Sequence, residues 1–149
     1  MKHILIASDL SPESLRPCKT VVHLAGQWGA KVTLLHVVQD LKIAPHGAPF
    51  APAISSPDLE KDLKHAQLAL EDQRAALEDG QHVEIEIAAI AAEKIPLAID
   101  HYAEEHGADL IAISTHGRTG WRHLALGSVA EAVIRHSKIP VLTFPRPKE

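Results

Sequence analysis

The sequence predicts an α/β protein with a doubly wound, five-stranded parallel sheet of strand order 3-2-1-4-5 and helices on both faces. Three observations support this prediction. Two short, continuous apolar runs, residues 4–7 and 110–113, have the composition of strands that are covered on both faces. Strand and helix patterns alternate along the whole chain. The segment 82–90 alternates between apolar and acidic residues, which is typical of a strand at a sheet edge.

Local signals give the approximate bounds of each element. Strands are expected at 3–8, 31–38, 82–90, 109–114 and 140–144, and helices at 12–28, 57–79, 95–106 and 128–137. The pairs Ser11-Pro12 and Ser56-Pro57 are typical of helix starts, because serine caps free amides and proline fits the first helical position. Three glycines are expected to end helices in the left-handed conformation: Gly29, Gly80 and Gly107.

The helix at 57–79 and the connection before it have distinct compositions. Four leucines form one apolar stripe on this helix, which is expected to pack on the sheet: Leu59, Leu63, Leu70 and Leu77. The proline- and alanine-rich segment 39–56 is longer than most ordered loops, so it is expected to be a long loop or a lid.

Composition limits the function classes. The length of 149 residues corresponds to a single domain over residues 1–149. Lys and Arg number 15 and Asp and Glu number 19, so the formal charge of −4 argues against nucleic acid as a partner. No apolar run approaches the roughly 20 residues of a membrane span, so no membrane partner is expected. With one cysteine, Cys18, and no signal-peptide layout after Met1, a cytoplasmic protein is expected.

The predicted strand order places a ligand crevice after the first and fourth strands, where the sheet changes direction. After the fourth strand, glycines and hydroxyl residues precede the last helix. Gly117 and Gly127 are expected to let backbone amides approach an anion, and the helix beginning at Ser128 adds free amides and a positive dipole end. Residues 114–138 carry a net charge of plus 3, from four basic side chains and Glu131, which also favours an anion. The alternative is structural: Ser128 and Glu131 fit a capping box, and the glycines fit turns.

The spacing of these residues resembles a known signature. From Thr115 through Pro145 the chain is similar to the C-terminal motif of the universal stress protein family, in which spaced glycines followed by serine or threonine bind ATP phosphates. Gly117, nine further residues and Gly127-Ser128 match that motif, and the similarity extends over the whole chain. It implies an adenine nucleotide alpha hydrolase-like fold and a stress-response role in signalling or regulation. The implied ligand is ATP, or AMP or ADP, with Mg²⁺.

The resemblance also assigns site residues. Asp9 is expected to bond to the ribose, Ala7 and Val37 to lie beside the adenine, and the glycine-rich segment to hold the phosphates. The complete set of expected binding residues is Ala7, Ser8, Asp9, Val37, Ser114, His116, Gly117, Arg118, Gly120, Gly127, Ser128 and Val129. Read without the resemblance, Asp9 is equally a turn aspartate and His116 a turn histidine. The resemblance further implies a homodimer through the last strand, 140–144.

Two departures from the family pattern leave alternatives open. Ser114 stands where the first glycine of the motif is found, and Lys94 stands where many relatives have glycine. Either change could weaken nucleotide binding, which favours a nucleotide-free dimeric interaction protein of the same fold. A weak ATPase is the other alternative, although no catalytic residues and no metal-ligating residues are expected.

Other ligand sites fit the sequence poorly. Eleven histidines are present, but His101 and His106 lie about 140° apart around a helix, which does not suit a shared metal ion. The P-loop and dinucleotide-binding glycine motifs are both missing. Cys18 has no convincing basic partner, so a structural thiol is expected.

Overall fold

The structure, a computed structural model, describes residues 1–42, 52–78, 82–115 and 127–145. Five strands form one sheet in the order β3-β2-β1-β4-β5, and each neighbouring pair is parallel. The strands are β1 (His3–Ala7), β2 (Lys31–Gln39), β3 (Ile85–Ala92), β4 (Leu110–Ser114) and β5 (Val141–Phe144). The predicted strand order is confirmed, with β3 at one edge as its alternating pattern indicated.

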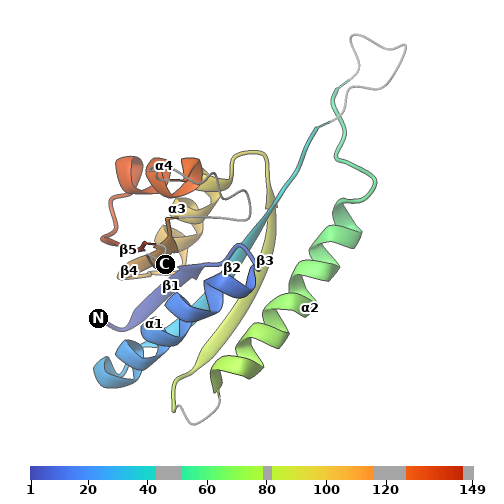
Figure 1. Cartoon of the computed structure of the whole chain (residues 1–149). Coiled ribbons are helices and arrows are strands. Elements are labelled where there is room, and N and C mark those ends of the chain that lie inside the picture. The colour runs from blue at the N-terminus through green and yellow to red at the C-terminus, as the bar shows by residue number, and fades with distance from the viewer. Residues whose placement is uncertain (43–51, 79–81, 116–126, 146–149) are drawn as a thin grey trace.

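Helices cover both faces of this sheet. They are a short 3-10 helix η1 (Pro12–Ser14), α1 (Leu15–Trp28), α2 (Leu59–Glu78), α3 (Ile95–Glu105) and α4 (Ser128–His136). Figure 1 shows α1 and α2 on one face and α3 and α4 on the other. The fold class predicted from the sequence is therefore confirmed.

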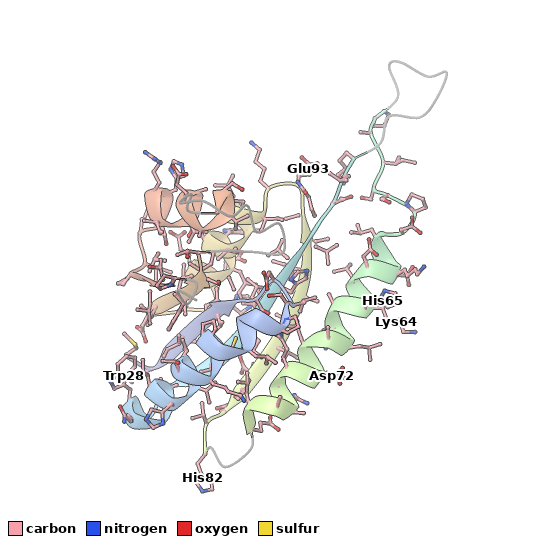
Figure 2. The ribbon with its side chains drawn as sticks, viewed as in Figure 1. Trp28, Lys64, His65, Asp72, His82 and Glu93 are labelled. Carbon is pink, nitrogen blue, oxygen red and sulfur yellow. The ribbon has the colours of Figure 1, made fainter. Side chains whose placement is uncertain are left out.

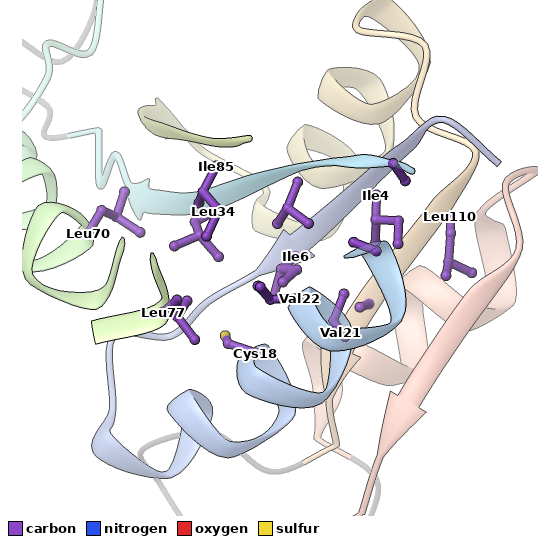
Figure 3. Close-up of a cluster of buried hydrophobic side chains, with 14 residues drawn as sticks. Ile4, Ile6, Cys18, Val21, Val22, Leu34, Leu70, Leu77, Ile85 and Leu110 are labelled. Atoms are coloured by element: carbon purple, nitrogen blue, oxygen red, sulfur yellow. The ribbon is translucent and has the colours of Figure 1, made fainter. Parts of the chain in front are cut away.

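Two separate apolar cores follow from the alternation of side chains along each strand. Ile4 and Ile6 of β1 join the cluster beneath α1 and α2, which contains Cys18, Leu70 and other residues labelled in Figure 3. Leu5, between them, points into the cluster beneath α3 and α4. Because neither face is open to water, residues 4–7 of β1 and 110–113 of β4 are uniformly apolar.

Several element bounds differ from the predictions by a few residues. Pro12–Ser14 form a 3-10 turn before α1, so the predicted helix 12–28 is two pieces. The helix predicted from 57 begins at Leu59, whose amide bonds to the carbonyl of Ser56. Gly29 ends α1 with φ 63°, as predicted, whereas Gly107, with φ 64°, lies one residue beyond the end cap of α3.

The apolar stripe of α2 includes one polar residue. Leu70 and Leu77 are buried as predicted, but Leu59 and Leu63 are only partly buried. The other buried residues of the helix are Ala66 and Gln73. The opposite side of the helix carries most of its charged residues, together with the exposed Leu68. Figure 2 shows Lys64, His65 and Asp72 there, and all three are exposed.

The described ends of the connection between β2 and α2, residues 40–42 and 52–58, extend away from the sheet in Figure 1. His36 to Gln39 of β2 pair only with β3, because β1 ends its pairing at Leu35. At the base of the connection, Ser55 Oγ donates a hydrogen bond of 2.8 Å to Asp40 Oδ2, and Lys42 Nζ lies 2.8 Å from the same oxygen. Residues 43–51, the centre of the predicted loop or lid at 39–56, lie outside the described residues. Among the helices described, none is long and apolar enough to cross a bilayer.

Candidate functional site

A cavity of about 200 Å³ lies where the sequence places the crevice, at the carboxyl ends of β1, β2 and β4 and the start of α4. Its walls are mainly apolar with a few polar groups, a composition that suits a small organic ligand. The lining residues are Ala7, Ser8, Asp9, Leu35, His36, Val37, Ile95, Ile99, Ile113, Ser114, Thr115, Gly127, Ser128, Val129 and Ala130.

Asp9 lines this cavity, and one of its carboxylate oxygens is buried. Its Oδ1 accepts hydrogen bonds from the Ser11 amide at 2.9 Å and the Ser11 hydroxyl at 2.6 Å. Its Oδ2 is buried and has no hydrogen-bond partner among the described residues. A buried carboxylate oxygen without a donor is costly, so a ligand hydroxyl at this point would stabilise it.

The turn that carries Asp9 has an unusual backbone. Leu10 has φ 63°, in the left-handed region that leucine rarely adopts. Its amide donates to Ser8 Oγ at 3.1 Å, and its side chain packs against the core beneath α1 and α2. His36 Nδ1 donates to the Ser8 carbonyl at 2.7 Å, which joins the turn to β2. Side chains on both sides therefore fix the position of Asp9.

The start of α4 also lines the cavity, and Gly127 there lies close to Thr115. The Gly127 amide donates to the Thr115 carbonyl at 2.7 Å, so it does not remain available to an anion. A Cβ at Gly127 would lie 2.9 Å from that carbonyl oxygen. The glycine is needed because the chain passes so close to Thr115.

The amides left to face a ligand are those of the first helical residues. Ser128, Val129 and Ala130 occupy the first turn of α4, where amides have no partner within the helix, and all three line the cavity. The capping-box interpretation of Ser128 and Glu131 is wrong, because Gly127 is the cap and Ser128 lies inside the helix. No side chain in the described part of the chain caps this end. The helix dipole favours an anion there.

Eight of the twelve residues predicted for the site line this one cavity: Ala7, Ser8, Asp9, Val37, Ser114, Gly127, Ser128 and Val129. Their roles toward a ligand stay predictions. His116, Gly117, Arg118 and Gly120 lie outside the described residues. Within the predicted set, Ser8 contributes less directly than expected, because its hydroxyl donates to Gln73 Oε1 at 2.8 Å.

The two residues that depart from the family pattern, Ser114 and Lys94, both leave the cavity open. Ser114 lines the cavity without closing it. Lys94 is exposed at the cap of α3 and is not among the lining residues, so it does not narrow this cavity.

Two of the four basic residues counted from the sequence lie away from the cavity. Arg135 pairs with Glu131 at 2.8 Å, and Lys138 with Glu104 at 3.7 Å. Arg135 lies in the last turn of α4 and Lys138 beyond that helix, at the opposite end from Ser128. The other two basic residues, at 118 and 122, lie outside the described part of the chain.

Sequence reasoning missed the apolar wall. Ile95 and Ile99 lie one turn apart at the start of α3 and line the cavity together with Leu35 and Ile113. Their spacing of four residues at the start of a helix that follows a parallel strand is a signal that could have found them.

Two further predictions concern residues away from the cavity. Burial, with Asp9 nearby, raises the pKa of the Cys18 thiol to about 12, so this cysteine is an unreactive core residue as expected. His101 lies 3.2 Å from Glu105, and His106 stacks on Tyr102 with ring centroids 3.8 Å apart. The described residues contain no group of three side chains suited to a metal ion.

Comparison with known proteins shows which family the chain belongs to. The model of the universal stress protein family matches residues 1–145. The chain belongs to this family. A curated universal stress protein, MJ0531 of Methanocaldococcus jannaschii, is 34% identical over 154 residues, which cover 99% of this chain and 84% of the relative.

Solved structures of universal stress proteins have the same fold. The structure of MJ0577 from M. jannaschii aligns with a TM-score of 0.76 and 27% identity, over 99% of this chain and 98% of that chain. A universal stress protein from Archaeoglobus fulgidus, solved in complex with dAMP, aligns with a TM-score of 0.62 and 22% identity, over 96% and 97% of the two chains. At that identity the second comparison establishes the fold alone.

Proposed function

We propose that this universal stress protein binds an adenine nucleotide in the cavity between β1, β2 and α4, and that occupancy regulates a stress response. The observation that carries the proposal is that Asp9, whose buried Oδ2 has no hydrogen-bond partner among the described residues, lines the same cavity as the first turn of α4. One end of the cavity thus suits a hydroxyl donor and another suits an anion, which are the two polar parts of a nucleotide.

The adenine is proposed to lie between the apolar side chains of Val37, Ile95 and Ile99, and the ribose hydroxyls to donate to Asp9. The phosphates are proposed to accept from the amides of Ser128 and Val129. The nucleotide complex of the A. fulgidus relative supports the ligand class. ATP is the proposed ligand, with AMP and ADP as the alternatives.

Mg²⁺ is proposed to arrive with a triphosphate. Among the described residues that line the cavity, Asp9 is the single carboxylate, and a magnesium ion usually takes one or two carboxylates, phosphate oxygens and water. The residues present therefore suit an ion held mainly by the ligand and not by a protein cage. The same shortage of acidic groups indicates that any hydrolysis is slow.

Isothermal titration with ATP, ADP and AMP, each with Mg²⁺ and with EDTA, tests the proposal, and GTP tests selectivity for adenine. Asp9→Asn keeps the shape and the Oδ1 acceptor but removes the charge. We expect it to weaken binding roughly tenfold or more, the effect of losing a hydrogen bond to a charged group. Asp58→Asn, at an exposed position before α2, is the matched control and should bind normally.

An absence of binding heat for every adenine nucleotide, with the protein folded, would contradict the proposal. The nucleotide-free interaction protein would then be the remaining function. We also propose that the protein acts in the cytoplasm, which the unpaired, buried thiol of Cys18 supports.

A homodimer through residues 140–144 is proposed as the assembly. β5 ends the sheet, and its four residues are all partly exposed. A partly apolar edge strand is an aggregation hazard unless it is covered, and pairing with a second copy covers it.

A further inference from the structure

Gln73 is a polar residue inside the apolar stripe of α2. It is 7% exposed, three residues after Leu70 and four before Leu77, both of which are buried in the core beneath α1 and α2. Burying a glutamine amide is unfavourable unless its oxygen and nitrogen both find partners. The amide oxygen and the amide nitrogen of Gln73 each have a hydrogen-bond partner. Both partners are serines that flank the turn containing Asp9.

The contacts of Gln73 extend to the two ends of that turn. Ser8 Oγ donates to Gln73 Oε1 at 2.8 Å, and Gln73 Nε2 donates to Ser14 Oγ at 3.2 Å. Ser14 Oγ donates in turn to the Ser11 carbonyl at 2.7 Å. Ser8, whose oxygen also accepts from the Leu10 amide at 3.1 Å, precedes Asp9 directly.

The protons in this network require an amide at position 73. Each serine hydroxyl has one proton, and both protons are used: that of Ser8 on Gln73, and that of Ser14 on Ser11. Ser14 Oγ therefore needs a donor and Ser8 Oγ needs an acceptor. A side-chain amide offers both from one planar group without a change of protonation, and glutamine has the length that reaches from the helix.

The turn depends on these contacts because its backbone is strained. Leu10 is held with φ 63°, which costs a non-glycine residue free energy and persists only when neighbours enforce it. The Leu10 amide is held by Ser8, and the Ser11 carbonyl by Ser14. Gln73 holds both serines.

We propose that Gln73 is a positioning residue that fixes the Asp9 turn from the far face of the sheet, and so sets the orientation of the Asp9 carboxylate toward the nucleotide. The inference about affinity rests on the proposed function. The inference about the turn itself does not, because the contacts exist without a ligand. A helix with no residue in the cavity thereby contributes to binding in it.

The test compares Gln73→Met with Gln67→Met, which makes the same change at an exposed position on the same helix. Methionine keeps the length and the apolar packing but makes neither hydrogen bond. By isothermal titration with ATP, Gln73→Met should weaken binding roughly three- to tenfold, the range for one lost hydrogen bond, and Gln67→Met should leave it unchanged.

Amide hydrogen exchange gives a readout without nucleotide. In Gln73→Met, the Leu10 and Ser11 amides should exchange about tenfold faster than in the wild type, while amides of the central strands keep their protection. Unchanged exchange at these two amides in a folded variant would overturn the inference. If wild type binds no nucleotide but these amides still lose protection, the proposed function fails and the positioning of the turn stands.

Gln73→Glu separates positioning from general destabilisation. An ionised carboxylate accepts from Ser8 but cannot donate to Ser14, whereas a protonated carboxyl does both. Because burial raises the pKa of a carboxyl, affinity relative to the wild type should be low at about pH 8 and recover at about pH 5.5. A ratio that stays constant across this range, together with normal affinity in Gln73→Met, would show that Gln73 has only a structural role.

Discussion

Asp9 and Gly127 both line the cavity, and they illustrate what a residue type can and cannot predict. The place of Asp9 just beyond the first strand was sufficient to predict that it lies at the crevice, because strand order fixes where strand ends meet. For Gly127, the sequence could not indicate the partner of its amide. Its amide bonds to Thr115, twelve positions earlier, and a contact of that range depends on how the intervening chain returns.

Replacing Gly127 by alanine should destabilise the fold. The new Cβ would lie 2.9 Å from the Thr115 carbonyl oxygen, so either the start of α4 or the end of β4 must move. We expect a loss of about 1–3 kcal/mol in the free energy of unfolding, or several degrees in the melting temperature, measured by thermal denaturation.

Gly26→Ala is the control for this change. Gly26 is exposed within α1, where alanine is a better helix former, so that variant should be as stable as the wild type or more so. Equal stability of Gly127→Ala and wild type would mean that the close approach to Thr115 does not constrain the chain.

At the level of elements, periodicity predicted which segments are helices and strands but not how α2 is anchored. The four predicted leucines placed the right face of α2 on the sheet. Gln73 was missed because a glutamine in a helix is exposed in most proteins, and its two serine partners come from another element. The base of the long connection was missed for the same reason, since Asp40 and Ser55 meet across fifteen positions.

The Asp40 carboxyl, at the base of the long connection, should titrate at an unusually low pH. Hydrogen bonds from Lys42 and then Ser55 hold the pKa of the Asp40 carboxyl below its ordinary value. A carboxyl with a lowered pKa in the folded state stabilises the fold above its unfolded pKa, and this contribution is lost as the pH falls through the folded value. Nuclear magnetic resonance shifts of Ser55 should therefore follow a midpoint below about 3.9.

Two variants check the assignment of this titration. Lys42→Met removes the largest cause, so the midpoint should move up toward the ordinary aspartate value. Asp40→Asn should abolish the transition at Ser55. A midpoint that does not respond to Lys42→Met would mean that the lysine is not what lowers the pKa of Asp40.

For the whole molecule, the open edge of β5 determines how two copies could meet. The carbonyls of Pro140 and Phe144 accept hydrogen bonds from the amides of Ile111 and Thr115, on the β4 side. Because backbone groups alternate in direction along a strand, those of Val141 and Thr143 point to the open side of the sheet. Strand order, which followed from patterns in the sequence, was sufficient to predict this edge. The pattern could not predict which backbone groups remain open, because that depends on the register with β4.

Thr143→Pro should separate the proposed dimer. Proline removes one amide on the open side without removing a donor to β4, and Thr143→Ala is the matched control that keeps the amide. Light scattering at micromolar concentration should give twice the chain mass of 16.1 kDa for wild type and the control, and the single-chain mass for Thr143→Pro. A wild-type protein that is monomeric under these conditions would rule out the homodimer.

The left-handed leucine in the Asp9 turn has a consequence for engineering. A search for greater heat resistance would select Leu10 early, because asparagine or glycine tolerates φ 63° better than leucine does. Either replacement would also remove the apolar side chain that secures the turn to the core beneath α1 and α2. Under the proposed function, a variant improved by thermal selection alone would bind the nucleotide more weakly, so this position is a poor choice wherever binding must be kept.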